Sequence, residues 1–235
     1  MLERFVNLFY PLTCPICGSV LSDKRKICKN CEKEVKIIRE PKCQKCGKPL
    51  ISDGKIYCND CRTRKRNFEK GVAVFEHTGK LRESIYRFKY DNARIYAEYY
   101  AKEAAKVYGK LFREWEIDTI VPVPIHKERE LKRGYNQALV FAETLAEYTK
   151  LPLERKLVIR AKNTVPQKEL EGDMRYLNLK NAFAVDKDRM KGVKNILLVD
   201  DIFTTGSTVD ACSGILKKAG AEKVYVLCIS AGRDN

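Results

Sequence analysis

Short apolar runs alternate with helix-like patterns along the last two thirds of the chain. The runs that have the length of β-strands lie at residues 68–77, 119–124, 157–160, 196–199 and 223–230. Apolar residues recur at helical spacing in residues 81–88, 94–112, 138–145 and 208–219. Strands that alternate with helices predict an α/β domain built on a mostly parallel sheet, with helices covering both faces.

The stretch ILLVDDIFTTGST, residues 196–208, joins one of these strands to one of these helices. Four apolar residues precede Asp200 and Asp201, and small hydroxylated residues follow around Gly206. The first turn of a helix carries unpaired N–H groups and the positive end of the helix dipole, so this loop is a candidate phosphate site. The residues expected to bind phosphate are Thr204, Thr205, Gly206, Ser207 and Thr208.

The two acids need another role, because carboxylates that point at a phosphate would repel it. Asp200 and Asp201 suit hydrogen bonds from sugar hydroxyls, or a hydrated Mg²⁺ ion, which takes one or two carboxylates. The implied ligand is a sugar phosphate. An ordinary strand, turn and helix with an Asp cap is the alternative, but it explains neither the adjacent acids nor four hydroxyls in five residues.

The segment LLVDDIFTTGST resembles the 5-phosphoribosyl-1-pyrophosphate (PRPP) motif of type I phosphoribosyltransferases. The resemblance implies that Asp200 and Asp201 bind the ribose 2′ and 3′ hydroxyls at the catalytic centre, and that the TTG loop binds the 5′-phosphate. Ligands of open parallel sheets bind beyond the carboxyl ends of the strands, so the basic segment after Val123 should share this rim. Its candidates for binding the leaving pyrophosphate are Lys127, Arg129 and Arg133.

Eight of the ten cysteines lie before residue 62, in four C-x-x-C pairs. Two thiolates at this spacing can face one ion at a tight turn, so four pairs predict two tetrahedral Zn²⁺ sites. Sequential pairing gives one site from Cys14, Cys17, Cys28 and Cys31, and another from Cys43, Cys46, Cys58 and Cys61. An interleaved pairing, first with third, stays open. Disulfides or a redox motif are weaker interpretations. Four thiolates leave no open coordination position, so the zinc is structural.

The cysteines and the strand pattern together predict two domains, a double zinc-ribbon module at 1–67 and a phosphoribosyltransferase-like domain at 68–235. A formal charge of +15 favours an anionic partner, either nucleic acid or a phosphorylated substrate. The cationic run from Arg62 to Arg66 either faces nucleic acid or is a solvated linker. No apolar run approaches the roughly 20 residues of a membrane span, and the first residues lack signal-peptide features. We therefore expect a cytoplasmic protein without membrane insertion.

Three further segments resemble the ComF family, whose members also carry an N-terminal zinc ribbon. They are PVPIHKERELKRGYNQA at 122–138, RAKNTVPQKEL at 160–170 and RYLNLKNAF at 175–183. The resemblance implies a role in the uptake of single-stranded DNA during natural transformation, with a helicase-like competence protein as partner at the inner face of the membrane. It also places Thr164, Gln167, Arg175 and Asn178 near the mouth of the active site.

Two functions fit these features. The first is an enzyme that transfers ribose 5-phosphate from PRPP to a nitrogenous acceptor, which the sequence does not identify. The second is a non-catalytic adaptor that senses PRPP and binds DNA for a helicase-like partner.

Overall fold

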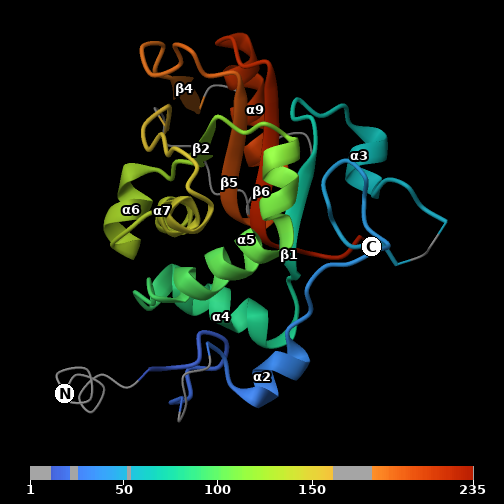
Figure 1. Ribbon diagram of the computed structural model, residues 1–235, viewed down its shortest axis with the longest axis vertical. Helices are drawn as coiled ribbons and strands as arrows, with labels where there is room; N and C mark the ends of the chain where they lie inside the picture. The colour runs from blue at the N-terminus through green and yellow to red at the C-terminus, as the bar shows by residue number, and fades with distance from the viewer. Residues whose placement is uncertain (1–11, 22–25, 52–53, 161–181, 235) are drawn as a thin grey trace.

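The fold is built around a four-stranded parallel sheet, as the strand pattern predicts. The computed structural model describes residues 12–21, 26–51, 54–160 and 182–234 (Figure 1). The sheet has the strand order β1-β6-β5-β2 and every neighbouring pair is parallel. Its strands are β1 (Gly71–Glu76), β2 (Thr119–Pro122), β5 (Asn195–Phe203) and β6 (Lys223–Ala231).

The two central strands are apolar on both sides because both faces of the sheet are covered. Successive residues of a strand point to opposite faces. Accordingly Leu197 and Val199 of β5 lie in one hydrophobic core, whereas Ile196 and Leu198 lie in the other. Strand β1 is also buried on both sides from Gly71 to Phe75, and it covers only the middle of the strand expected at residues 68–77.

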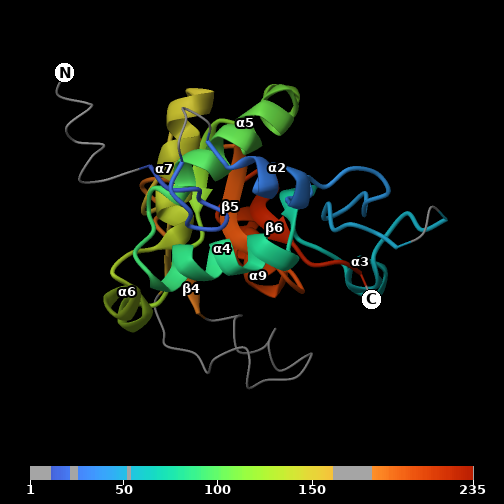
Figure 2. The ribbon, with the colours of Figure 1, turned by 90° about the horizontal axis from the view of Figure 1, so that it is seen from below.

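Helices pack on both faces of this sheet (Figure 2). One core contains side chains of α4 (Gly79–Tyr90), α5 (Tyr96–Glu114) and α7 (Gln137–Thr149). The other contains the apolar side of α9 (Ser207–Lys218). All four helices were expected from sequence. Ile95 and Val107 are part of the apolar pattern at residues 94–112, but they are exposed because tyrosines and small residues of α5 face the sheet instead.

Two features differ from the sequence prediction. The basic segment after Val123 contains the short helix α6 (Lys127–Arg133), which is not among the helices that the apolar pattern predicts. The strand predicted at 157–160 forms as β3 (Val158–Arg160), but it does not join the parallel sheet. It pairs antiparallel with β4 (Phe183–Val185) in a separate two-stranded sheet.

The N-terminal cysteine-rich segment wraps around the free edge of β1. Side chains of its first half, Ile16 among them, share the core of α4 and α5, and those of its second half share the core of α9. Between them, the Ile38 amide donates to the Val74 carbonyl at 2.9 Å, and the Glu76 amide donates to the Lys36 carbonyl at 2.9 Å. These bonds satisfy the edge of the sheet, which would otherwise present unpaired backbone groups.

The predicted boundary between residues 67 and 68 therefore separates two segments that pack into common cores. That the two segments fold independently as domains stays a prediction. Within the described residues, no helix combines the length and the apolar character needed to cross a lipid bilayer.

Two glycines in equivalent C-x-x-C-G turns allow a test of this packing. Gly18 and Gly47 both have a left-handed φ, +79° and +73°, but only at Gly47 would an added Cβ meet the sheet, 2.7 Å from the Val72 Cα. We expect Gly18→Ala to cost about 1–2 kcal/mol through backbone strain alone. Gly47→Ala should cost about 1–3 kcal/mol more through overpacking. Equal losses in denaturant unfolding would contradict the close contact between ribbon and sheet.

Candidate functional site

The predicted phosphate loop connects β5 directly to α9. Gly206 is the N-cap of α9 and has a φ of +76°, and a side chain there would collide with the Phe203 ring. The Thr205 and Ser207 hydroxyls lie 2.9 Å apart. Four of the five predicted phosphate ligands, Thr204, Gly206, Ser207 and Thr208, line one small cavity together with Asp200. A helix N-terminus with several hydroxyls at its mouth suits a phosphate group.

The two acids near the end of β5 lie in different surroundings. Asp201 forms an ion pair with Lys89 of α4 at 3.0 Å, and both side chains are mostly buried. The Asp200 carboxylate accepts a hydrogen bond from the Asp201 amide at 2.8 Å. Burial and the neighbouring Asp201 carboxylate raise the pKa of Asp200 to about 7. A cation or sugar hydroxyls beside Asp200 would favour its charged form.

The segment proposed for pyrophosphate lies near these acids, as the rim rule predicts. Arg133 donates to the Gln137 side chain at 2.9 Å and its guanidinium lies 5.1 Å from the centre of the Tyr90 ring. Its charge also favours ionised Asp200. Arg129 lies close enough to Arg160 to contribute to a lowered pKa of that guanidinium, whose main cause is burial. Lys127 is exposed, and its side chain forms no hydrogen bond or ion pair with the described residues.

Lys89 and Arg160 also lie beside the candidate site, although neither was a named candidate in the sequence. Lys89 carries no sequence signal beyond its position in an amphipathic helix. Arg160 closes β3, at the start of a segment expected at the active-site mouth, and its guanidinium lies 5.2 Å from the Phe183 ring centre. The other residues expected there, Thr164, Gln167, Arg175 and Asn178, lie outside the described residues.

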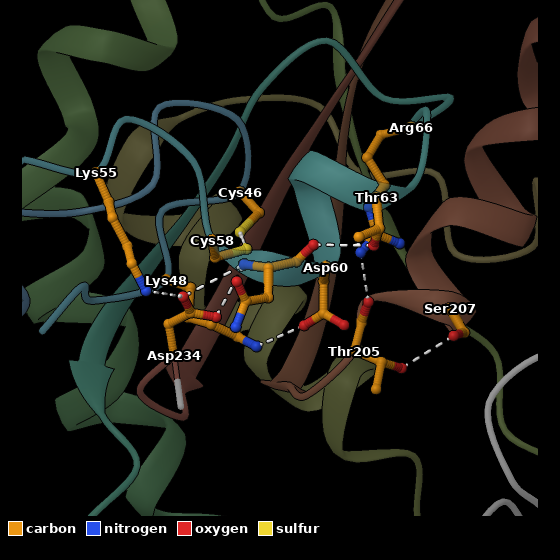
Figure 3. A network of polar contacts seen from close by, with 11 residues as sticks. Cys46, Lys48, Lys55, Cys58, Asp60, Thr63, Arg66, Thr205, Ser207 and Asp234 are labelled. Carbon is orange, nitrogen blue, oxygen red and sulfur yellow. Dashed lines mark hydrogen bonds and ion pairs between the residues drawn. The ribbon is translucent and has the colours of Figure 1, made fainter.

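Arg66 supports the phosphate loop from the ribbon side (Figure 3). Its side chain is only 8% exposed, and its Nη2 donates to the Thr205 carbonyl at 2.8 Å. The next residue, Asn67, donates its amide to the Asp210 carboxylate at 2.7 Å, in the first turn of α9. The cationic run at 62–66 is therefore not a uniformly solvated patch, because its last arginine is buried against the loop.

The eight N-terminal cysteines form two tetrads, each made of sequential pairs. Within each tetrad all Sγ atoms lie within 4.8 Å of one another. The Sγ atoms of Cys17 and Cys28 are 3.8 Å apart, and those of Cys46 and Cys58 are 3.6 Å apart. A tetrahedral ion with Zn–S bonds of about 2.3 Å requires S···S distances of about 3.8 Å, so the donors fit zinc. None of the ten cysteines forms a disulfide bond, which does not fit a disulfide framework.

In each tetrad a short helix begins directly after the first cysteine of the second pair and contains the other cysteine of that pair. Helix α2 (Lys29–Glu34) follows Cys28, and α3 (Asn59–Thr63) follows Cys58. The Asn59 amide donates to the Asp234 carboxylate at 3.0 Å, and Lys48 forms an ion pair with Asp60 at 2.7 Å (Figure 3). The second tetrad is thus tied to the C-terminal segment as well as to the phosphate loop.

Comparisons with known proteins match both halves of the chain. A family model described as a double zinc ribbon domain matches residues 5–62, and one described as a phosphoribosyl transferase domain matches residues 95–234. Competence protein F of Haemophilus influenzae is 33% identical, over 93% of this chain and 96% of its own length. The chain belongs to the ComF family. Its family and its fold class were both predicted correctly from the motifs.

More distant members of the ComF family align over nearly the same length. Competence protein ComFC of Bacillus subtilis is 28% identical, over 92% of this chain and 93% of its own. The DNA utilization protein YhgH of Salmonella typhimurium is also 28% identical, over 94% of this chain and 98% of its own length. The two tetrads lie inside the matched zinc-ribbon segment, so they are structural zinc sites. The roles of the individual PRPP-site residues stay predictions.

We expect the purified protein to contain zinc in both tetrads, and zinc removal to destabilise the sheet as well. The reason is that Cys43, Cys46 and Cys58 share a core with β5 and α9. Cys46→Ser should reduce the metal content to about one ion per chain and lower the melting temperature. Cys212→Ser is the control, because this buried cysteine is outside both tetrads. Metal analysis that finds no zinc, or unfolding of the sheet that does not respond to chelation, would contradict this expectation.

The raised pKa of Asp200 predicts a pH-dependent change in stability. Its pKa is about 7 in the folded state, against an ordinary value of 3.8, so between these values the unfolded chain ionises while the folded protein keeps Asp200 protonated. Folding therefore becomes more costly as the pH rises through this range, and the full cost applies above about pH 7. Asp200→Asn removes this cost. Without ligand or Mg²⁺ the variant should melt a few degrees above the wild type at about pH 8, and the difference should vanish near pH 4. The exposed Asp188→Asn is the control, and a pH-independent difference would refute the assignment.

Proposed function

We propose that this ComF-family protein binds PRPP with Mg²⁺ at the end of β5 and works in the handling of single-stranded DNA taken up by the cell. One observation carries the PRPP proposal: two acids, a hydroxyl-rich loop and the N-terminus of α9 follow one another at the end of β5. The matched phosphoribosyl transferase domain includes all of these residues.

In the proposed complex, three groups of residues hold three parts of PRPP. The amides and hydroxyls of residues 204–208 bind the 5′-phosphate. Asp200 and Asp201 accept hydrogen bonds from the ribose hydroxyls, and Mg²⁺ would bind with them. The pyrophosphate faces the arginines of α6, with Arg133 nearest to the acids and Arg129 beside Arg160. Ligand binding has to replace or share the Lys89–Asp201 ion pair, which connects the site to α4.

The chemistry proposed for this arrangement is transfer of ribose 5-phosphate to a nitrogenous acceptor. The bond from C1 to the pyrophosphate oxygen breaks, and a bond from C1 to the acceptor nitrogen forms. The pyrophosphate leaves with the bonding electrons, and the acceptor releases a proton. Arg133 and Arg129 stabilise the charge that develops on the leaving group, while the loop and the acids keep the sugar in place.

The DNA part of the proposal rests on the family. The printed names of the relatives refer to competence and to DNA utilization. A basic protein of +15 is compatible with a nucleic-acid partner. We place the protein in the cytoplasm, at the inner face of the membrane through a helicase-like competence protein.

The adaptor function differs from this one only in turnover. It gains support from the Lys89–Asp201 ion pair, because this contact lets PRPP binding act on α4 without any reaction. Measuring pyrophosphate release with PRPP, Mg²⁺ and a panel of bases separates the two functions. Release that depends on one acceptor supports the enzyme, and tight PRPP binding without release with any acceptor supports the adaptor.

Calorimetry with PRPP and Mg²⁺ tests the site itself. Asp201→Asn should weaken binding about tenfold or more, because a charged acceptor is lost. Arg66→Ala should also weaken it, by loosening the loop through the Thr205 carbonyl. Arg62→Ala is the matched control, since this arginine lies in the same cationic run but contacts Asn59 on the surface. Equal affinities for all four proteins would place PRPP elsewhere.

A further inference from the structure

A cleft of about 650 Å³ adjoins the acid pair on the side of α4. Ile202, which follows the acids on β5, lines it from one side. Lys89, the ion-pair partner of Asp201, lines it from the other. An occupant of this cleft would therefore lie directly beside the proposed ribose site.

Two exposed tyrosines form the outer wall of this cleft. Tyr86 is 61% exposed and Tyr90 is 47% exposed, and their ring centres lie 4.8 Å apart on one face of α4. Arg133 lies over the Tyr90 ring and contacts its hydroxyl at 3.4 Å. The wall is thus connected to the pyrophosphate segment as well as to the acids. Exposed aromatic faces stack on nucleic-acid bases regardless of sequence.

One basic residue, Arg82, continues this surface along the helix. Arg82, Tyr86 and Tyr90 follow one another at intervals of four residues, so they lie on one face of α4 over about 12 Å. Arg82 is exposed and forms no ion pair within the described part of the chain. Glu83 and Asp91 also line the cleft. These acids would repel backbone phosphates, which leaves the Arg82 end and the Arg133 end as the places where phosphates fit.

We propose that this cleft binds a base of single-stranded DNA, stacked on Tyr86 and Tyr90, with flanking phosphates near Arg82 and Arg133. The proposal rests on the proposed function, since it names the surface for its DNA partner. A strand fits better than a free base because the cleft is open and has cations beyond its aromatic wall. Since Lys89 and Arg133 contact both sites, PRPP and DNA should also change each other's affinity by the same factor.

The test measures binding of a fluorescent oligothymidylate by anisotropy at several salt concentrations. Replacing both Tyr86 and Tyr90 by Ala should weaken binding about tenfold or more at every salt concentration. The salt dependence should stay unchanged, because stacking releases no counterions, whereas Arg82→Ala should reduce it. Replacing both tyrosines by Phe should preserve binding. Tyr57→Ala is the matched control, because Tyr57 is 49% exposed but lies in the second ribbon.

Each outcome supports or overturns the proposal. Unchanged affinity in the double Ala variant, with its circular dichroism intact, overturns it while leaving the proposed function standing. A wild-type protein that binds PRPP but no oligonucleotide refutes the DNA part of the proposed function. Free thymine or adenine that binds in a tyrosine-dependent way, while oligonucleotide binding ignores the tyrosines, would make the cleft an acceptor pocket and overturn the proposal.

Discussion

The site depends on the burial of β5 between two cores. This strand pairs with β6 on one side and β2 on the other, and its apolar residues alternate between the two hydrophobic clusters. A strand held on both edges and both faces has little freedom, so the position where it ends is well defined. The position of the strand end in turn fixes where the acids at 200–201 and the loop before α9 lie. A phosphate site needs such rigidity, since its amides must point at one place before the ligand arrives.

The zinc ribbons contribute to the same rigidity from outside the sheet. They pack on opposite faces, and the segment between them covers the edge of β1. The second ribbon also reaches the phosphate loop through the hydrogen bond from Arg66 to Thr205. Phe68 adds an edge-to-face contact with Phe203, at the base of that loop. Zinc thus stabilises a small module that alone would bury little apolar area, and this module supports the loop.

The electrostatics of the site favour a ligand that carries both hydroxyls and phosphates. Two adjacent carboxylates repel each other, and burial raises the pKa of Asp200 to about 7, so the ligand-free site is costly to keep fully charged. Lys89 compensates Asp201, and Arg133 compensates Asp200 in part. These two cations also border the cleft on α4. A change of charge at the acids therefore changes the electrostatic potential in that cleft.

The sequence by itself determined the features that arise over short distances along the chain. The order of strand, acids, loop and helix follows from local periodicity, and each C-x-x-C pair follows from a single tight turn. These motifs were enough to identify the family and the parallel sheet. The interleaved pairing of cysteines stayed open at that stage, because spacing alone does not say which turns meet.

Only the tertiary structure decided which distant residues complete the site. Arg66 reaches Thr205 across 139 residues of sequence, so in the sequence it looks like one more charge in a cationic run. Lys89 meets Asp201 because α4 packs beside the end of β5, and β3 leaves the parallel sheet because its partner is β4. Such contacts depend on how buried faces pack, and the polar residues that they bring together carry no periodic signal of their own.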